Sequence, residues 1–117
     1  MKKITERKRL IKKLDDLWAK KIKERDGFTC QRCKSQSKRL NACHFYGRRN
    51  KTLRWDLDDG VTLCVGCHFW AHSNPAEFTE WFKEWTGEET FERLQTKKNN
   101  KTKTDLANLK LIYLQLQ

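Results

Sequence analysis

The sequence predicts a small α+β domain, mostly helical, with a β-hairpin at its centre that is held by a zinc ion on four cysteines. Segments at both ends carry apolar residues at helical spacing. Two short apolar runs in the middle have the length of strands. Two Cys-x-x-Cys pairs supply four thiolates, the ligand set of a structural zinc site. A chain of 117 residues fits one compact domain.

The first element is an amphipathic helix expected between Thr5 and Arg25. Apolar residues recur there at three- and four-residue steps between lysines and arginines, namely Leu10, Ile11, Leu14, Leu17, Trp18 and Ile22. Gly27 follows and is typical of a helix end. Residues 1–27 are therefore predicted to form a basic helix that packs on the core.

A hairpin is expected next, with strands at Leu40 to Phe45 and at Val61 to Cys64. The segment between them, residues 46–60, is too long for a tight turn and is rich in Arg, Lys and Asp. Tyr46 and Trp55 are expected to anchor it as an ordered loop.

Helices are expected from Cys67 onward, and they complete a central domain over residues 28–95. Asn74-Pro75 breaks the first of them, because proline suits the first turn of a new helix. The second carries an aromatic stripe, expected to pack on the N-terminal helix, that consists of Phe78, Trp81, Phe82 and Trp85. Thr86-Gly87 ends it, and a short helix follows from Glu88 to Gln95.

Residues 96–117 are predicted to form a basic linker and a C-terminal amphipathic helix. Thr104 is a suitable N-cap, and the apolar residues of this helix are Leu106, Leu109, Ile112 and Leu116. Its apolar side requires a partner. It either packs back on the domain or pairs with a second copy or another protein.

The charge distribution favours a nucleic-acid partner. Lys and Arg number 26 against 15 Asp and Glu, and the net charge of +11 resides in the first 74 residues. Residues 75–95 reverse the sign, with two bases and six acids. Such asymmetry indicates a face that meets phosphates, although a solvated basic helix explains the N-terminal segment equally well.

Composition also excludes a membrane protein and argues against disulfides. No apolar run approaches the roughly 20 residues of a bilayer span, and the N-terminus is charged where a secretory signal is apolar. A cytoplasmic location is expected, in which cysteines stay reduced.

The paired cysteines predict one structural zinc ion, bound by Cys30, Cys33, Cys64 and Cys67. Thirty residues separate the two pairs, so an element is inserted between them. Four thiolates leave no open coordination position, so this ion is expected to contribute folding energy rather than chemistry.

All three histidines lie near these cysteines. His44 sits at the end of the first predicted strand, one residue before Phe45, while His68 directly follows Cys67 and His72 comes four residues later. Residues four apart share one helix face, so His68 and His72 can chelate one divalent ion.

Together these motifs resemble the HNH, or His-Me finger, endonucleases. The resemblance covers residues 26–85 and is greatest for phage endonuclease VII-type and NinG/Rap-type recombination nucleases. It rests on the segments Cys30-x-x-Cys33, Ala42-Cys43-His44, Asp59 to Leu63 and Cys64-x-x-Cys67-His68. It implies a ββα-metal motif that clamps one catalytic metal, with His44 as general base and with His68 and His72 as metal ligands.

Two positions depart from the family pattern. Asp59 stands where the family usually has its middle Asn, and it is expected to orient His44 by accepting a hydrogen bond, which would raise the pKa of the imidazole. Cys43 stands where a metal-binding Asp or His often precedes the base. It is either a thiolate ligand or a buried residue, because neighbouring strand residues point to opposite faces.

The resemblance implies a metal-dependent DNA endonuclease that is phage-type and weakly sequence-specific and that serves DNA recombination, packaging or restriction inside the bacterial host. Its catalytic metal is expected to be Mg²⁺ or Mn²⁺, with Ni²⁺ or Zn²⁺ as alternatives suited to imidazole ligands. DNA phosphates are expected to meet the loop cations Arg48, Arg49, Lys51 and Arg54. The alternative is a non-catalytic, zinc-stabilised nucleic-acid-binding protein.

Overall fold

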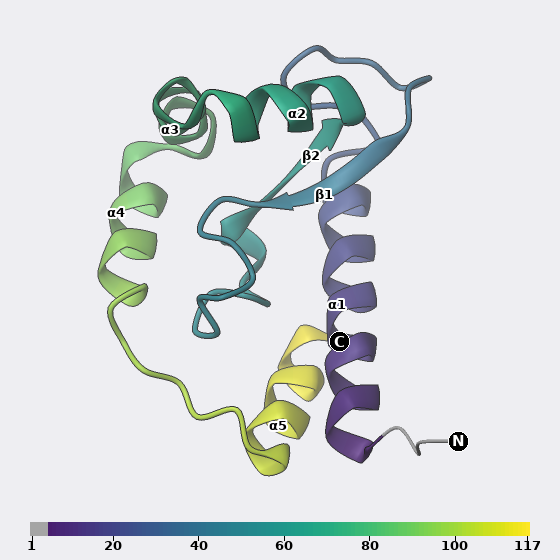
Figure 1. Ribbon diagram of the computed structural model, residues 1–117, viewed down its shortest axis with the longest axis vertical. Coiled ribbons are helices and arrows are strands. Elements are labelled where there is room, and N and C mark those ends of the chain that lie inside the picture. The colour runs from purple at the N-terminus through teal and green to yellow at the C-terminus, as the bar shows by residue number, and fades with distance from the viewer. Residues whose placement is uncertain (1–4) are drawn as a thin grey trace.

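Two antiparallel strands lie among five α-helices in the computed structural model, which describes residues 5–117 (Figure 1). The elements are α1 (Glu6–Arg25), β1 (Leu40–His44), a 3₁₀ turn (Leu57–Asp59), β2 (Gly60–Cys64), α2 (Val65–Ser73), α3 (Pro75–Thr86), α4 (Glu88–Lys97) and α5 (Leu106–Leu116). The predicted α+β class is thus confirmed. The first four residues of the predicted segment 1–27 lie outside this description. Among residues 5–117, no helix combines the length and hydropathy that crossing a bilayer requires.

Helix α1 begins at a capped residue and presses directly on the hairpin. The Thr5 side chain accepts a hydrogen bond from the Lys8 N–H, which satisfies one free donor of the first turn. A Cβ atom at Gly60 would lie 2.4 Å from Trp18 and 2.6 Å from Ile22. Only glycine fits there, so α1 packs tightly on the sheet where Gly60 pairs with His44.

The hairpin register places the metal-binding and catalytic candidates. Leu40 pairs with Cys64 at one end, and His44 pairs with Gly60 at the other. Cys43 points into the core shared with α2 and α3, whereas His44 stacks on Trp18 of α1. Strand alternation thus sends these two neighbours to different surroundings.

The aromatic stripe of α3 packs on Phe45 and α4, and the prediction that it packs on α1 is wrong. The Phe45 ring stacks on Phe82, with centroids 4.4 Å apart, and lies 5.6 Å from Phe91 of α4. The end of α1 approaches this stripe, where the Arg25 guanidinium lies 5.3 Å from the Trp85 ring. The chain turns at Pro75, so α3 covers the hairpin on the side of the Phe45 core instead of joining the core under α1.

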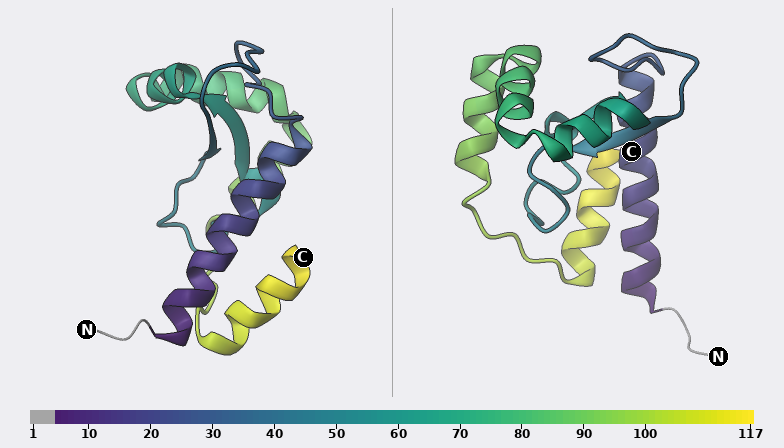
Figure 2. Two further views of the ribbon diagram at one scale, coloured as in Figure 1. Left: turned by 90° about the vertical axis from the view of Figure 1, so that its right-hand side faces the viewer. Right: turned by 45° about the horizontal axis from the view of Figure 1, so that its top comes forward.

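Helix α5 packs back on α1, with both helices pointing the same way (Figure 2). Near their starts, Arg7 donates to the Thr104 carbonyl at 3.0 Å, and near their ends, Lys21 donates to the Gln117 carbonyl at 3.1 Å. The helix cap is Asp105 rather than Thr104, since the Asp105 side chain accepts from the Asn108 N–H. Of the two arrangements predicted for this helix, packing on the domain is the one observed.

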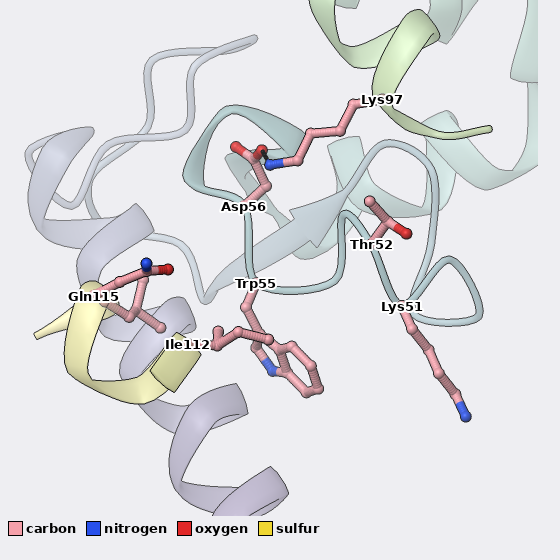
Figure 3. Close-up of a pocket in the computed structure, with 8 residues that line it drawn as sticks. Lys51, Thr52, Trp55, Asp56, Lys97, Ile112 and Gln115 are labelled. Carbon is pink, nitrogen blue, oxygen red and sulfur yellow. Dashed lines mark hydrogen bonds and ion pairs between the residues drawn. The ribbon is translucent and has the colours of Figure 1, made fainter. Parts of the chain in front are cut away.

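The loop between the strands is held from several sides. Leu53 and Trp55 are buried, and Asp56 binds Lys97 of α4 at 2.7 Å. Figure 3 shows the Trp55 ring beside Ile112 of α5, while the Lys51 side chain extends away from both. The loop is therefore an ordered part of the domain, as predicted.

Candidate metal centre and histidine cleft

The four cysteines of the two Cys-x-x-Cys pairs meet as predicted. Their sulfur atoms all lie within 4.8 Å of one another. The Gln31 N–H, inside the first pair, donates to the Thr62 carbonyl of β2 at 3.0 Å, which holds the first pair beside the strand that leads into the second. In each pair the second cysteine N–H points at the first sulfur, from Cys33 to Cys30 at 3.5 Å and from Cys67 to Cys64 at 3.4 Å. This cluster is compatible with a tetrahedral metal ion such as zinc.

The pKa values of the cluster cysteines favour a bound cation. Burial alone would raise the pKa of Cys30, but N–H groups directed at its sulfur lower it to about 6. At Cys67, burial and the neighbouring sulfurs raise the pKa to about 12, although Arg32 donates to this sulfur at 3.5 Å. A bound divalent ion allows all four to become thiolates.

A separate cleft of about 390 Å³ lies between α1, the end of β1 and α2. All three histidines, His44, His68 and His72, line it, together with Asp15 and Arg48. The structure thus brings the predicted base and both predicted ligands to one cavity.

Among residues 5–117, only one of the two ring nitrogens of His44 has a hydrogen-bond partner. Its Nε2 lies 2.8 Å from the Arg54 carbonyl oxygen, which only accepts, so Nε2 carries the hydrogen and donates. Its ring stacks on Trp18, with centroids 3.8 Å apart and planes 3° from parallel. Burial lowers the pKa of His44 although the Arg54 carbonyl opposes this. His44 is therefore neutral at pH 7, with Nδ1 available as an acceptor.

Asp59 holds the backbone after His44 rather than the imidazole itself. Its Oδ1 accepts from the Tyr46 N–H at 3.0 Å, and its backbone carbonyl accepts from the Phe45 N–H at 2.9 Å. The expected hydrogen bond to His44 is instead made by the Arg54 carbonyl. The role predicted for Asp59 is therefore wrong. Its carboxyl binds the loop backbone at Tyr46, and the Arg54 carbonyl orients His44 instead.

The Asp59 carboxyl is fully buried, and its Oδ2 has no hydrogen-bond partner within residues 5–117. Burial raises its pKa to about 8, although the Tyr46 N–H opposes this. At neutral pH the group is mostly protonated, and a neutral carboxyl has nearly the shape of an amide.

Replacing Asp59 by Asn is expected to stabilise the protein increasingly as the pH rises. Because the pKa of Asp59 in the folded protein lies above its ordinary value of 3.8, the stability that Asp59 contributes is complete at low pH and falls as pH rises toward about 8. Between pH 6 and 8.5 the difference in unfolding free energy, variant minus wild type, should grow by roughly 3 kcal/mol. Urea denaturation of zinc-loaded proteins measures it.

Asp58→Asn is the matched control, because Asp58 is the exposed neighbour. Its substitution should give a difference that changes little over the same pH range. An equally flat difference for Asp59→Asn would show that the carboxyl is ionised in the folded state.

His68 and His72 converge on one point of the cleft. Their Nε2 atoms lie 2.8 Å apart. Two nitrogen ligands of one cation lie roughly 3 Å apart, so this pair fits a divalent ion. On the other side of its ring, His68 Nδ1 lies 3.2 Å from the side-chain nitrogen of Asn41, a residue that sequence reasoning missed.

Cys43 does not join the histidine pair. Its side chain is 3 % exposed, and burial raises the pKa of its thiol to about 12. Within residues 5–117, the only group of three or more converging potential metal ligands consists of the four cysteines of the two Cys-x-x-Cys pairs. Of the two alternatives for Cys43, the buried core residue is the one that the geometry favours.

The loop cations separate into two kinds. Arg54 makes a two-bond ion pair with Asp15, at 3.1 and 2.8 Å, and its side chain is only 18 % exposed. Arg48 also binds Asp15, at 2.8 Å, but is 61 % exposed, and Arg49 and Lys51 are exposed as well. Arg54 therefore fixes the loop, and the other three remain candidates for phosphate contact.

Asp15 is the second residue that sequence reasoning missed. It also accepts from the Trp55 indole N–H at 2.9 Å. Burial alone would raise the pKa of Asp15, but hydrogen bonds from Arg54 and Trp55 and the arginine charges lower it. This ionised carboxylate ties the loop to α1 beside His44. The only indication of this role in the sequence was an acidic residue directly after the apolar Leu14 in a basic helix.

Comparisons with protein-family models, with curated proteins and with solved structures found no match to this chain. The functional argument therefore rests on the geometry of the cleft.

Proposed function

We propose that this chain is a metal-dependent DNA endonuclease of the HNH type, similar to phage recombination nucleases, with zinc at the four-cysteine cluster. The observation that carries the proposal is one cleft that holds a neutral histidine with a free Nδ1 and a pair of histidines with converging Nε2 atoms. The order of elements also supports it: β1 and α2 line the cleft, β2 pairs with β1 and leads directly into α2, and a hairpin followed by a helix is the core of that family.

In the proposed reaction, His44 Nδ1 accepts a proton from the attacking water. The hydroxide forms a bond to phosphorus as the bond to the 3′ oxygen breaks, and the departing 3′ oxygen takes a proton from a solvent water, which leaves a 5′-phosphate and a 3′-hydroxyl. The Arg54 carbonyl keeps the opposite ring nitrogen protonated and stabilises the imidazolium that forms. A divalent cation on His68 and His72 would stabilise charge on the phosphate oxygens. Arg48, at the edge of the cleft, is placed to bind a phosphate.

The substrate backbone is proposed to continue along α1. Asp15 and Ala19 of α1 line the cleft. Residues three and four apart share a helix face, so Lys8, Lys12 and Lys23 extend the same face beyond the cleft. Lys8 and Lys12 are exposed, and the track from Lys8 to Ala19 is about 16 Å long at the rise of an α-helix.

Lys8→Gln combined with Lys12→Gln is expected to weaken binding of a labelled duplex and to lower the salt slope of log K by about 2, because each lysine neutralises about one phosphate. Fluorescence anisotropy across a salt series, without catalytic metal, measures both.

The control is Lys13→Gln with Lys20→Gln, which removes the same charge from the other side of α1. Lys12 and Lys20 are matched, since each pairs with an acid one turn on. Equal effects of both pairs would contradict the track.

The test of the function is nicking of supercoiled plasmid by protein that carries one zinc per chain. Nicking is expected with added Mg²⁺ or Mn²⁺, and with Ni²⁺ or Zn²⁺ if imidazole preference dominates. It should be absent without added metal. A protein that binds the plasmid but cuts with none of these ions is a zinc-stabilised DNA-binding protein without catalytic activity, and the proposal fails.

A further inference from the structure

We propose that Asn41 is a positioning residue that sets which nitrogen of His68 carries the hydrogen, so that His68 can exchange its bond to His72 for a bond to the cation. The proposal rests on the metal site proposed above, and it concerns a residue outside the motifs that carry the family resemblance.

Asn41 reaches His68 from the strand beside it. It lies in β1 opposite Leu63, and His68 lies on α2, which begins directly after β2. The Asn41 Nδ2 atom is 3.2 Å from His68 Nδ1, and His68 Nε2 is 2.8 Å from His72 Nε2. Both nitrogens of this half-buried ring are thus engaged. Within residues 5–117, Asn41 is the only hydrogen-bond partner of His68 Nδ1.

Without a cation, these contacts require the hydrogen of His68 on Nε2. The Asn41 amide donates to Nδ1, which must then be unprotonated. A neutral imidazole carries its one hydrogen on the other nitrogen, so Nε2–H of His68 donates to Nε2 of His72.

With a cation, the hydrogen must be on Nδ1, because Nε2 has to present its lone pair. The group facing Nδ1 then has to accept. Asn41 can accept after its side-chain amide rotates by about 180°, because the amide carries both a donor, Nδ2, and an acceptor, Oδ1. An aspartate satisfies only the second arrangement, and an alanine neither. Partners of this kind orient a ligating imidazole, and their loss typically weakens metal binding 10- to 100-fold.

The test uses zinc-loaded protein, with one zinc per chain, and has two readouts. Long-range ¹H–¹⁵N NMR identifies the tautomer of His68 before and after a further equivalent of Zn²⁺. Wild type should change from Nε2–H to Nδ1–H. Asn41→Asp should be Nδ1–H before the addition. Calorimetry with Mn²⁺ should show binding 10- to 100-fold weaker for Asn41→Ala and at least as tight as wild type for Asn41→Asp.

Asn50→Ala is the matched control, because Asn50 is also a half-buried asparagine with hydrogen bonds to the backbone, but it lies in the loop. It should change neither readout. Unchanged Mn²⁺ affinity in Asn41→Ala, or an Nε2–H tautomer in metal-free Asn41→Asp, overturns the proposal. If wild type binds no Mn²⁺, the proposed nuclease site fails, while the tautomer of Asn41→Asp still decides the role of Asn41.

Discussion

His44→Ala is expected to reduce plasmid nicking at least about 100-fold while duplex binding changes little, because the variant loses a general base and no phosphate-binding cation. The free Nδ1 of His44 is the proton acceptor in the proposed reaction, and the Arg54 carbonyl and the Trp18 ring fix it in place. Initial rates of nicking at saturating metal and protein, with anisotropy for binding, separate the two effects.

Chemical rescue makes this prediction specific. Removal of the ring leaves a space between Trp18 and the Arg54 carbonyl in which free imidazole can stack and donate as His44 does. Added imidazole should restore part of the nicking by His44→Ala. It should not rescue His68→Ala together with His72→Ala in the same way, because those rings are proposed to hold the metal. Nicking by His44→Ala at the wild-type rate would remove His44 from the mechanism.

The features predicted correctly from the sequence are those with local patterns. Helix α1 followed from apolar spacing and the glycine after it, and the hairpin followed from two short runs bounded by the cysteine pairs. The convergence of Cys30 and Cys64 followed from ligand chemistry, because two such pairs have few other uses. Even the position of His44 at the strand end was predicted, since it depended only on where β1 stops.

What the sequence left open depends on contacts between distant segments. Asp15 meets Arg54 and Trp55 from 39 and 40 residues away, and Asn41 meets His68 from 27 residues away. The carbonyl that orients His44 belongs to the backbone and has no residue signature. A stripe of aromatic residues shows that one face of α3 is buried but not which element buries it, so the packing predicted for α3 was wrong.

Removal of the cluster metal is expected to unfold the domain. Structural zinc contributes on the order of 10 kcal/mol of folding free energy, which is comparable to the whole stability of a small domain. The cluster joins the segment before β1 to the junction of β2 and α2, and both walls of the histidine cleft depend on that hairpin. A zinc chelator should therefore abolish the cooperative thermal transition and most of the helical circular dichroism.

Two of the five cysteines allow a test of metal binding. Burial predicts that the Cys43 substitution destabilises the fold more, whereas metal binding predicts that the Cys33 substitution does. Cys33 is exposed and belongs to the cluster, whereas Cys43 is buried and does not. If the cluster binds zinc, Cys33→Ser should lose the ion and the fold, and Cys43→Ala should keep one zinc per chain at a cost of roughly 1–2 kcal/mol. Native mass spectrometry and urea denaturation measure both. The reverse order would mean that the cysteines act only as core residues, and the cleft would then have to be stabilised by packing alone.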